Sequence, residues 1–257
     1  MTQIPNTTST RRILLTISYD GTAYAGWQRQ LNAMAVQQCI EEALCKLTNE
    51  KIVITGASRT DSGVHALGQR AHFDTASRIP ADRFAYALNN CLPFDIRITS
   101  STEVASGFHA RYDAKGKRYT YRIHNAPHAS AMYRHLCAYV PYQLNIPLMQ
   151  EALTSLLGTH DFTAFQSSGG TAKTTIRTLS AIDLTCHGSD LVLTVEGNAF
   201  LYNMVRIIVG TMLDIGMERI PPNAFDQALQ TGDRRKLGVT APACGLELTE
   251  VFYSIAQ

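Results

Sequence analysis

Residues 12–20 read RILLTISYD. Apolar side chains occupy every second position of this stretch, at Ile13, Leu15, Ile17 and Tyr19. A period of two is typical of a β-strand that buries one face. Residues 36–47 then carry apolar side chains at helical spacing. Strands over 52–55, 67–74 and 96–104 follow, with a helix beginning near Pro80 before the last of them. The first half therefore has the order β-α-β-β-α-β.

The second half repeats this order less regularly. It predicts strands over 118–124, 136–140, 178–186, 191–196 and 248–254, and helices over 146–157, 202–217 and 223–230. Two split β-α-β units of the ferredoxin type predict a duplicated α+β fold. We expect two antiparallel sheets that merge across a central cleft.

Composition excludes several classes of protein. Hydrophobic residues make up 45% of the 257 residues and charged residues 17%, which excludes a disordered, collagenous or coiled-coil chain. No stretch approaches the ~18 apolar residues of a membrane span, and residues 1–10 lack the apolar core of a secretory signal. The six cysteines form no C-x-x-C pair and the histidines form no metal-binding motif. We expect a cytoplasmic protein with no membrane segment, no metal and a disordered tail over 1–10.

Basic residues concentrate in one segment, although the formal net charge of the chain is only +2. Between Glu103 and His135 there are six basic residues and two acidic ones, with four tyrosines among them. Basic side chains beside aromatic ones suit the phosphates and bases of a nucleic acid. A solvated strand face with tyrosines in the core has the same composition, so charge alone leaves both interpretations open.

The segment 58–65, SRTDSGVH, crowds charged residues into a short connection between two predicted strands. Asp-Ser-Gly is ordinary turn chemistry, so a plain hairpin explains the segment taken alone. Three other segments change the balance. They are 19–30, YDGTAYAGWQRQ, with the only tryptophan; 108–112, FHARY; and 198–206, NAFLYNMVR. Arg206 lies among apolar residues, where an arginine normally needs a carboxylate partner.

Together these segments resemble the tRNA pseudouridine synthase A (TruA) family. The matching patterns are YDGT-x-Y-x-GWQRQ, RTD-x-GVHA, FHAR, KRYTY, NAFL-x-x-MVR and APACGL. They occur in order from Tyr19 to Leu246 and so cover nearly the whole chain. Each pattern alone is weak, and their conjunction is specific.

Four positions depart from the family pattern. Ser58 and Ser62 stand where the family typically has Gly and Ala, Asn203 where a His is common, and Glu247 where a Tyr is common. The two serines lie close to the key aspartate, so they bear on the conformation of its loop.

The resemblance implies a pseudouridine synthase fold and an isomerase that acts on tRNA. It implies an N-terminal α+β half over 11–106 that carries the catalytic loop, and a C-terminal α+β half over 107–257. The two halves would form one catalytic unit around a cleft. The enzyme would be a homodimer that binds the tRNA anticodon stem-loop, would modify uridines 38, 39 and 40, and would need no cofactor or metal.

The resemblance also implies residue roles. Asp61 would be the catalytic aspartate, with Arg206 as the partner of its carboxylate. Tyr119 would pack against the flipped base, Arg59 would enter the vacated stack, and Leu246 would form a wall of the pocket. The RNA-contact segment would comprise Phe108, His109, Ala110, Arg111 and Tyr112.

Other basic and flexible positions are further candidates for contact with RNA. We expect phosphate contacts from among Lys115, Lys117, Arg118 and Arg122. The Gly- and Ser-rich loop 167–173 is either an RNA-gripping segment or a plain connection.

The chemistry suits these residue types. Pseudouridine formation breaks the N1–C1′ bond of uridine, turns the base and rejoins it through C5. One carboxylate nucleophile suffices for covalent capture, whereas hydrolytic glycosidases generally use two carboxylates because they activate water. The sequence leaves open whether Asp61 attacks C1′ or C6. It also leaves two other hypotheses, an inactive RNA-binding module and a hydrolytic N-glycosidase.

Overall fold

The computed structural model describes residues 10–254, so the predicted tail over 1–10 lies outside the described residues except for Thr10. The N-terminal half contains β1 (Arg11–Tyr19), α1 (Val36–Thr48), β2 (Thr55–Gly56), β3 (His65–Thr75), α2 (Phe84–Asn89) and β4 (Ile96–Val104). A single 3₁₀ turn over 81–83 precedes α2. The predicted order β-α-β-β-α-β is confirmed.

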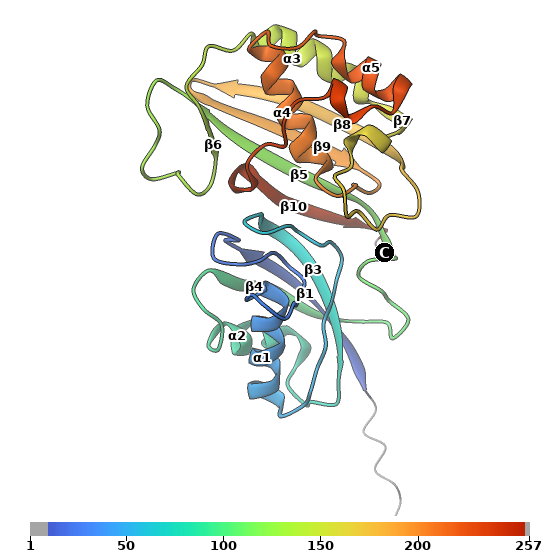
Figure 1. The fold of residues 1–257 in the computed structure, drawn as a ribbon. Coiled ribbons are helices and arrows are strands. Elements are labelled where there is room, and N and C mark those ends of the chain that lie inside the picture. Colours follow the sequence, from blue (N-terminus) through green and yellow to red (C-terminus); the bar gives the residue numbers. More distant parts are fainter. Residues whose placement is uncertain (1–9, 255–257) are drawn as a thin grey trace, which may run out of the picture.

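The C-terminal half adds six strands and three helices. They are β5 (Ala114–Asn125), β6 (Ala138–Val140), α3 (Ile146–Leu153), β7 (Gly158–Asp161), β8 (Ile176–His187), β9 (Asp190–Gly197), α4 (Met204–Gly216), α5 (Ala224–Thr231) and β10 (Leu246–Tyr253). In Figure 1, α1 and α2 lie with the N-terminal half, and α3, α4 and α5 lie with the C-terminal half.

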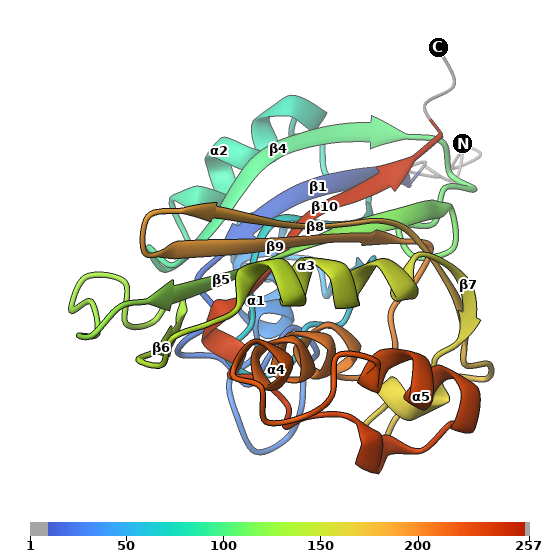
Figure 2. The ribbon, with the colours of Figure 1, turned by 90° about the horizontal axis from the view of Figure 1, so that it is seen from above.

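All ten described strands form one sheet, whose main path runs β4-β1-β3-β10-β5-β9-β8-β7. The predicted pair of antiparallel sheets is thus a single sheet with a junction at its centre. Strand β10 pairs antiparallel with β5 along its length and parallel with β3 through two residue pairs, Glu247 with His65 and Leu248 with Ala66. Figure 2 shows β10 between the strands of the two halves. The last strand therefore joins the halves.

Helix α4 forms the core of the C-terminal half. Eleven of its thirteen residues are buried, as expected for a helix that is apolar on nearly every face. It begins after Asn203, whose φ of 62° lies in the left-handed region. Gly210 brings α4 against the backbone of Val239, because a Cβ at this glycine would overlap the Val239 carbonyl oxygen. Among residues 10–254, no helix combines the length and the apolar character needed to cross a membrane.

Two local features differ from the sequence-based expectation. The predicted strand over 52–55 is reduced to β2, and β7 is additional. Leu67, expected on the side of Ala71 and Phe73, is 51% exposed, whereas those two are buried. The β1–β3 register shifts between the pairs Ile17–Gln69 and Tyr19–Ala66. A bulge of this kind re-aims the side chains beside it.

The close packing at Gly210 generates a test of the fold. We expect Gly210→Ala to lower the free energy of unfolding by about 2 kcal/mol, because the added methyl must displace the backbone at Val239. Gly107→Ala is the matched control, since no atom lies within 4 Å of a Cβ built there. Urea denaturation measures both, and equal midpoints for the two variants would contradict this account of α4.

Candidate functional site

The connection between β2 and β3 contains Asp61 and is anchored to the loop that follows β1. Trp27 donates its backbone N–H to the Thr60 carbonyl at 3.1 Å, and Gly63 donates to the Tyr24 carbonyl at 3.3 Å. Gly26 permits this approach, because its φ is 90° and a Cβ there would overlap Thr60. The two glycine-containing motifs therefore dock on each other and fix the backbone at Asp61.

Buried polar groups fix the β2–β3 connection from the interior of the protein. Gln69 is fully buried and brackets Ser58, accepting from its N–H at 3.2 Å and donating to its carbonyl at 2.7 Å. The Tyr19 hydroxyl lies 2.7 Å from the Thr60 Oγ1 atom. Both contacts are buried or partly buried, where satisfied polar networks restrict a segment to one arrangement. The connection is thus more than the plain hairpin that its composition allows.

The Asp61 carboxylate faces Arg206 from α4. The Asp61 Oδ2 and Arg206 Nη1 atoms are 3.7 Å apart, and the two side chains are 26% and 18% exposed. Arg206 is oriented by two hydrogen bonds of 2.8 Å, from Nε to the Ala241 carbonyl and from Nη1 to Asn203 Oδ1. Asn203, which departs from the family pattern, therefore helps to aim the guanidinium.

Burial is the larger of two opposed influences on Asp61. Burial raises the pKa of the Asp61 carboxyl and Arg206 lowers it, and the net direction is upward from the ordinary value. Arg206 thus favours the ionised carboxylate as the sequence predicts, but it does not outweigh desolvation.

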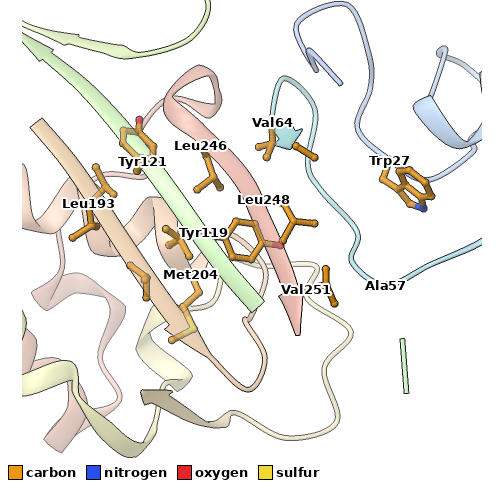
Figure 3. Packing of buried hydrophobic residues seen from close by; sticks show 14 of the residues in the cluster. Trp27, Ala57, Val64, Tyr119, Tyr121, Leu193, Met204, Leu246, Leu248 and Val251 are labelled. Atoms are coloured by element: carbon orange, nitrogen blue, oxygen red, sulfur yellow. The ribbon is translucent and has the colours of Figure 1, made fainter. Parts of the chain in front are cut away.

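Tyr119 projects from β5 toward the same connection. Its hydroxyl lies 2.8 Å from the Ser58 Oγ atom, and Phe200 meets its ring edge-on with centroids 5.0 Å apart. Burial raises the pKa of Tyr119 to about 12, with the Ser58 hydrogen bond lowering it and Asp61 raising it, so the phenol is neutral near pH 7. Figure 3 shows Tyr119 between Met204 and β10, with Leu246 on the adjacent strand.

Ser58, Asp61, Tyr119 and Phe200 line one cleft of about 850 Å³ between the two halves, and Arg206 lies behind Asp61, outside the residues that line it. Of the residues singled out in the sequence, Arg59, Asp61, Tyr119, Leu246, Arg111 and Tyr112 line it. Its size is within the range of small-ligand sites, about 300–1,000 Å³. The cleft is thus large enough to admit a base, with one carboxylate at its wall.

The predicted RNA-contact segment divides into two parts. Ala110 is fully buried, and Phe108 packs on Tyr253 with ring centroids 5.2 Å apart. Arg111 and Tyr112 are exposed at the cleft. The His109 ring stacks on the Tyr112 ring with centroids 4.1 Å apart. The first part anchors the segment and the second presents side chains to the cleft.

The four basic candidates of β5 also separate. Arg118 is paired with Glu196 and Glu250, and Arg122 is paired with Glu247. Lys115 is exposed and is not among the residues that line the cleft, whereas Lys117 is. Residues 169–173 line the cleft as well, and Ser167 accepts a 3.0 Å hydrogen bond from Asn203.

Sequence reasoning missed three residues of this site. Phe200 lay within a quoted motif but was given no role, and nothing local marks Gln69 as a support of the β2–β3 connection or Arg177 as part of the cleft. Lys117 was among the basic candidates, and strand alternation favours it over Arg118 and Arg122, because it stands two positions before Tyr119 and so shares its face.

Comparisons with known proteins identify the family of this chain. The model of the family described as tRNA pseudouridine synthase matches residues 15–113 and 152–254. The tRNA pseudouridine synthase A of Acetivibrio thermocellus is 51% identical over 95% of this chain and all of its own length. That of Ruminiclostridium cellulolyticum is 50% identical with the same coverage.

Among solved structures, a Cbf5-Nop10-Gar1 complex matches with a TM-score of 0.38 and 13% identity. The match covers 93% of this chain and 50% of that one. The family model covers Asp61 and Arg206, whereas Tyr119 lies between its two matched ranges. The two relatives each match over 95% of the chain. The chain belongs to the tRNA pseudouridine synthase family.

Proposed function

We propose that this protein isomerises uridine to pseudouridine in the anticodon stem-loop of tRNA, at positions 38, 39 and 40. Family membership and two relatives named tRNA pseudouridine synthase A support the reaction and the class of RNA. The observation that carries the proposal is the single carboxylate among the described residues of the cleft, Asp61, beside Arg206 and Tyr119.

Asp61 acts as the nucleophile that captures the nucleotide. The N1–C1′ bond breaks, the base turns, and a C5–C1′ bond forms while C5 loses its proton and N1 gains one. The balance needs no oxidant, no phosphate energy and no water, so one carboxylate is enough. Partial burial limits access of water to the detached base.

The target base must leave its helix to reach Asp61. Flipping a paired base costs a few kcal/mol, and the exposed Arg59 guanidinium at the rim of the cleft is suited to fill the vacated stack. The Tyr119 ring, fixed by Phe200, offers a flat face for the uracil. Its hydroxyl can then relay the C5 proton, because the oxygen accepts that proton while the hydroxyl's own proton passes to solvent.

We further propose that the protein works in the cytoplasm as a homodimer that grips one tRNA. The resemblance to the family supports both statements. The cleft takes up a nucleotide, whereas a tRNA is far larger than the cleft, so a second protomer would provide additional surface for it. Size-exclusion chromatography with light scattering measures the mass of the particle with and without tRNA.

Asp61→Asn tests the nucleophile. We expect pseudouridine formation to fall by roughly 10³-fold or more, because an amide cannot form the covalent bond. The measurement is release of tritium from tRNA labelled at uridine C5. Asp183→Asn, at an exposed position, is the matched control and keeps full activity. Undiminished turnover by Asp61→Asn would rule out this residue as nucleophile.

The same assay separates the alternatives. An isomerase releases tritium and leaves the base attached to the RNA. A hydrolytic N-glycosidase liberates free uracil, and an inactive binding module retains both label and base. Chromatography of the digested RNA distinguishes the three outcomes.

Arg206→Met tests the electrostatic partner. Ionised Asp61 is the reactive form, and its pKa is raised, so activity is lost as the pH falls through that raised pKa. Without Arg206 burial acts unopposed, and we expect the acid limb of kcat/KM to move to higher pH. Arg219→Met, which removes a pair of the same 3.7 Å length from Asp214, leaves the limb in place. An unshifted limb in Arg206→Met would contradict the pairing.

Tyr119→Phe tests the hydroxyl apart from the ring. The ring contact with Phe200 is kept and the bond to Ser58 is lost. We expect kcat to fall by about 10²-fold, within the range of general acid–base contributions, and KM to change by less than about threefold. Tyr86→Phe, at an exposed position, serves as control. A change confined to KM would assign Tyr119 to binding alone.

A further inference from the structure

The cleft wall carries cations that no acid among the described residues neutralises. Asp61 is the only carboxylate among its described lining residues. Five cationic side chains accompany it: Arg59, Arg111, Lys117, Lys173 and Arg177. Asp61 pairs with Arg206 instead, and within residues 10–254 none of the five forms an ion pair. The wall therefore presents uncompensated positive charge to whatever enters.

Strand β5 places paired and unpaired cations on opposite faces. Arg118 lies on one face, bonded to Glu196 at 2.7 Å and to Glu250 at 2.8 Å. Lys117 and Tyr119 alternate with it on the cleft face. The acidic residues of β9 and β10 thus neutralise Arg118 on the outer face of the sheet, and they do not neutralise the cation on the cleft face.

Lys117 is crowded by like charges. It is half-buried, and the charged groups that act on it are Arg111, from the segment before β5, and Arg177, from β8. Its partners in the register of β9 and β10 are Gly197 and Val251, which carry no charge. Burial, followed by these two cations, lowers the pKa of Lys117 to about 8.

Arg177 provides independent evidence for a hydrogen-bond acceptor that the described residues do not supply. Its Nη1 atom donates to the Ile176 carbonyl at 2.6 Å and to Thr174 Oγ1 at 3.3 Å. Its Nε atom is buried and has no hydrogen-bond partner within the described part of the chain. A buried donor without an acceptor costs free energy, and an anion beside the guanidinium would relieve that cost.

We propose that Arg111, Lys117 and Arg177 together bind one phosphodiester group of the tRNA strand that delivers its uridine to Asp61. This inference rests on the proposed function. Lys117 stands two residues from Tyr119 along β5, about 7 Å at the usual strand rise. One nucleotide spans that distance, so a base against Tyr119 has its own or the adjacent phosphate at Lys117.

Lys117→Met tests the phosphate site, with Lys46→Met, at an exposed position of α1, as control. We expect KM for tRNA to rise about tenfold in Lys117→Met, the loss of one charge-assisted contact, and kcat to fall by a smaller factor. In a plot of log affinity against log salt concentration, the magnitude of the slope should fall by about one, as expected for the loss of one phosphate contact. Lys46→Met should change neither quantity, because Lys46 lies outside the cleft.

A neutral phosphate analogue locates the contact on the RNA. Single methylphosphonate linkages are placed at each position flanking the target uridine in a stem-loop RNA. At one position we expect the substitution to weaken binding to the wild-type protein about tenfold and to leave binding to Lys117→Met unchanged. Equal losses in both proteins at every position would overturn the proposal.

The pH dependence of KM is a measurement that a purely structural role of Lys117 would not change. Lys117 loses its charge as the pH rises through about 8, so KM should rise between pH 7 and pH 9 for the wild-type protein. Lys117→Arg keeps its charge and should have a flat profile and near-normal affinity. A wild-type protein that forms no pseudouridine would refute the proposed function. Pseudouridine formation with KM and salt slope unaffected by Lys117→Met would refute the phosphate site alone.

Discussion

The protonation state of Asp61 is the constraint on which the rest of the site depends. Partial burial disfavours its charge, and Arg206, 3.7 Å away, favours it. The carboxylate comes from the N-terminal half and the guanidinium from α4 of the C-terminal half. The balance between these opposed influences therefore requires the two halves to be held in one relative position.

Several features of the structure fix the relative position of the two halves. The β2–β3 connection is fixed by Trp27, Gly26 and Gln69, while Asn203 and Ala241 aim Arg206. Strand β10 lies between β3 and β5 in the sheet and pairs with both, and it therefore joins the two halves. The same strand carries Leu246 into the cleft and Glu250 to its outer face, where it pairs with Arg118. Charge is thus neutralised outside the cleft and left uncompensated within it.

Much of the fold could be predicted from the sequence because its signals are local. The alternation in β1 and the apolar face of α1 gave their bounds to within one residue. The exposure of Leu67 could not be predicted, since it follows from a register shift between two strands. The central place of β10 is equally non-local. At the site, family patterns pointed to Asp61, Tyr119 and Arg206, but the net rise in the pKa of Asp61 depends on burial, which only the three-dimensional structure reveals.

The position of β10 has a consequence for biosynthesis. Along the chain β10 follows every other described element, yet it lies between β3 and β5 in the sheet. While residues 246–253 are still inside the ribosome, each half can acquire its own helices and strands, but the seam between them has no central strand. The nascent protein is therefore unable to assemble its cleft until β10 has emerged, and competence to modify RNA requires that strand as well as both halves.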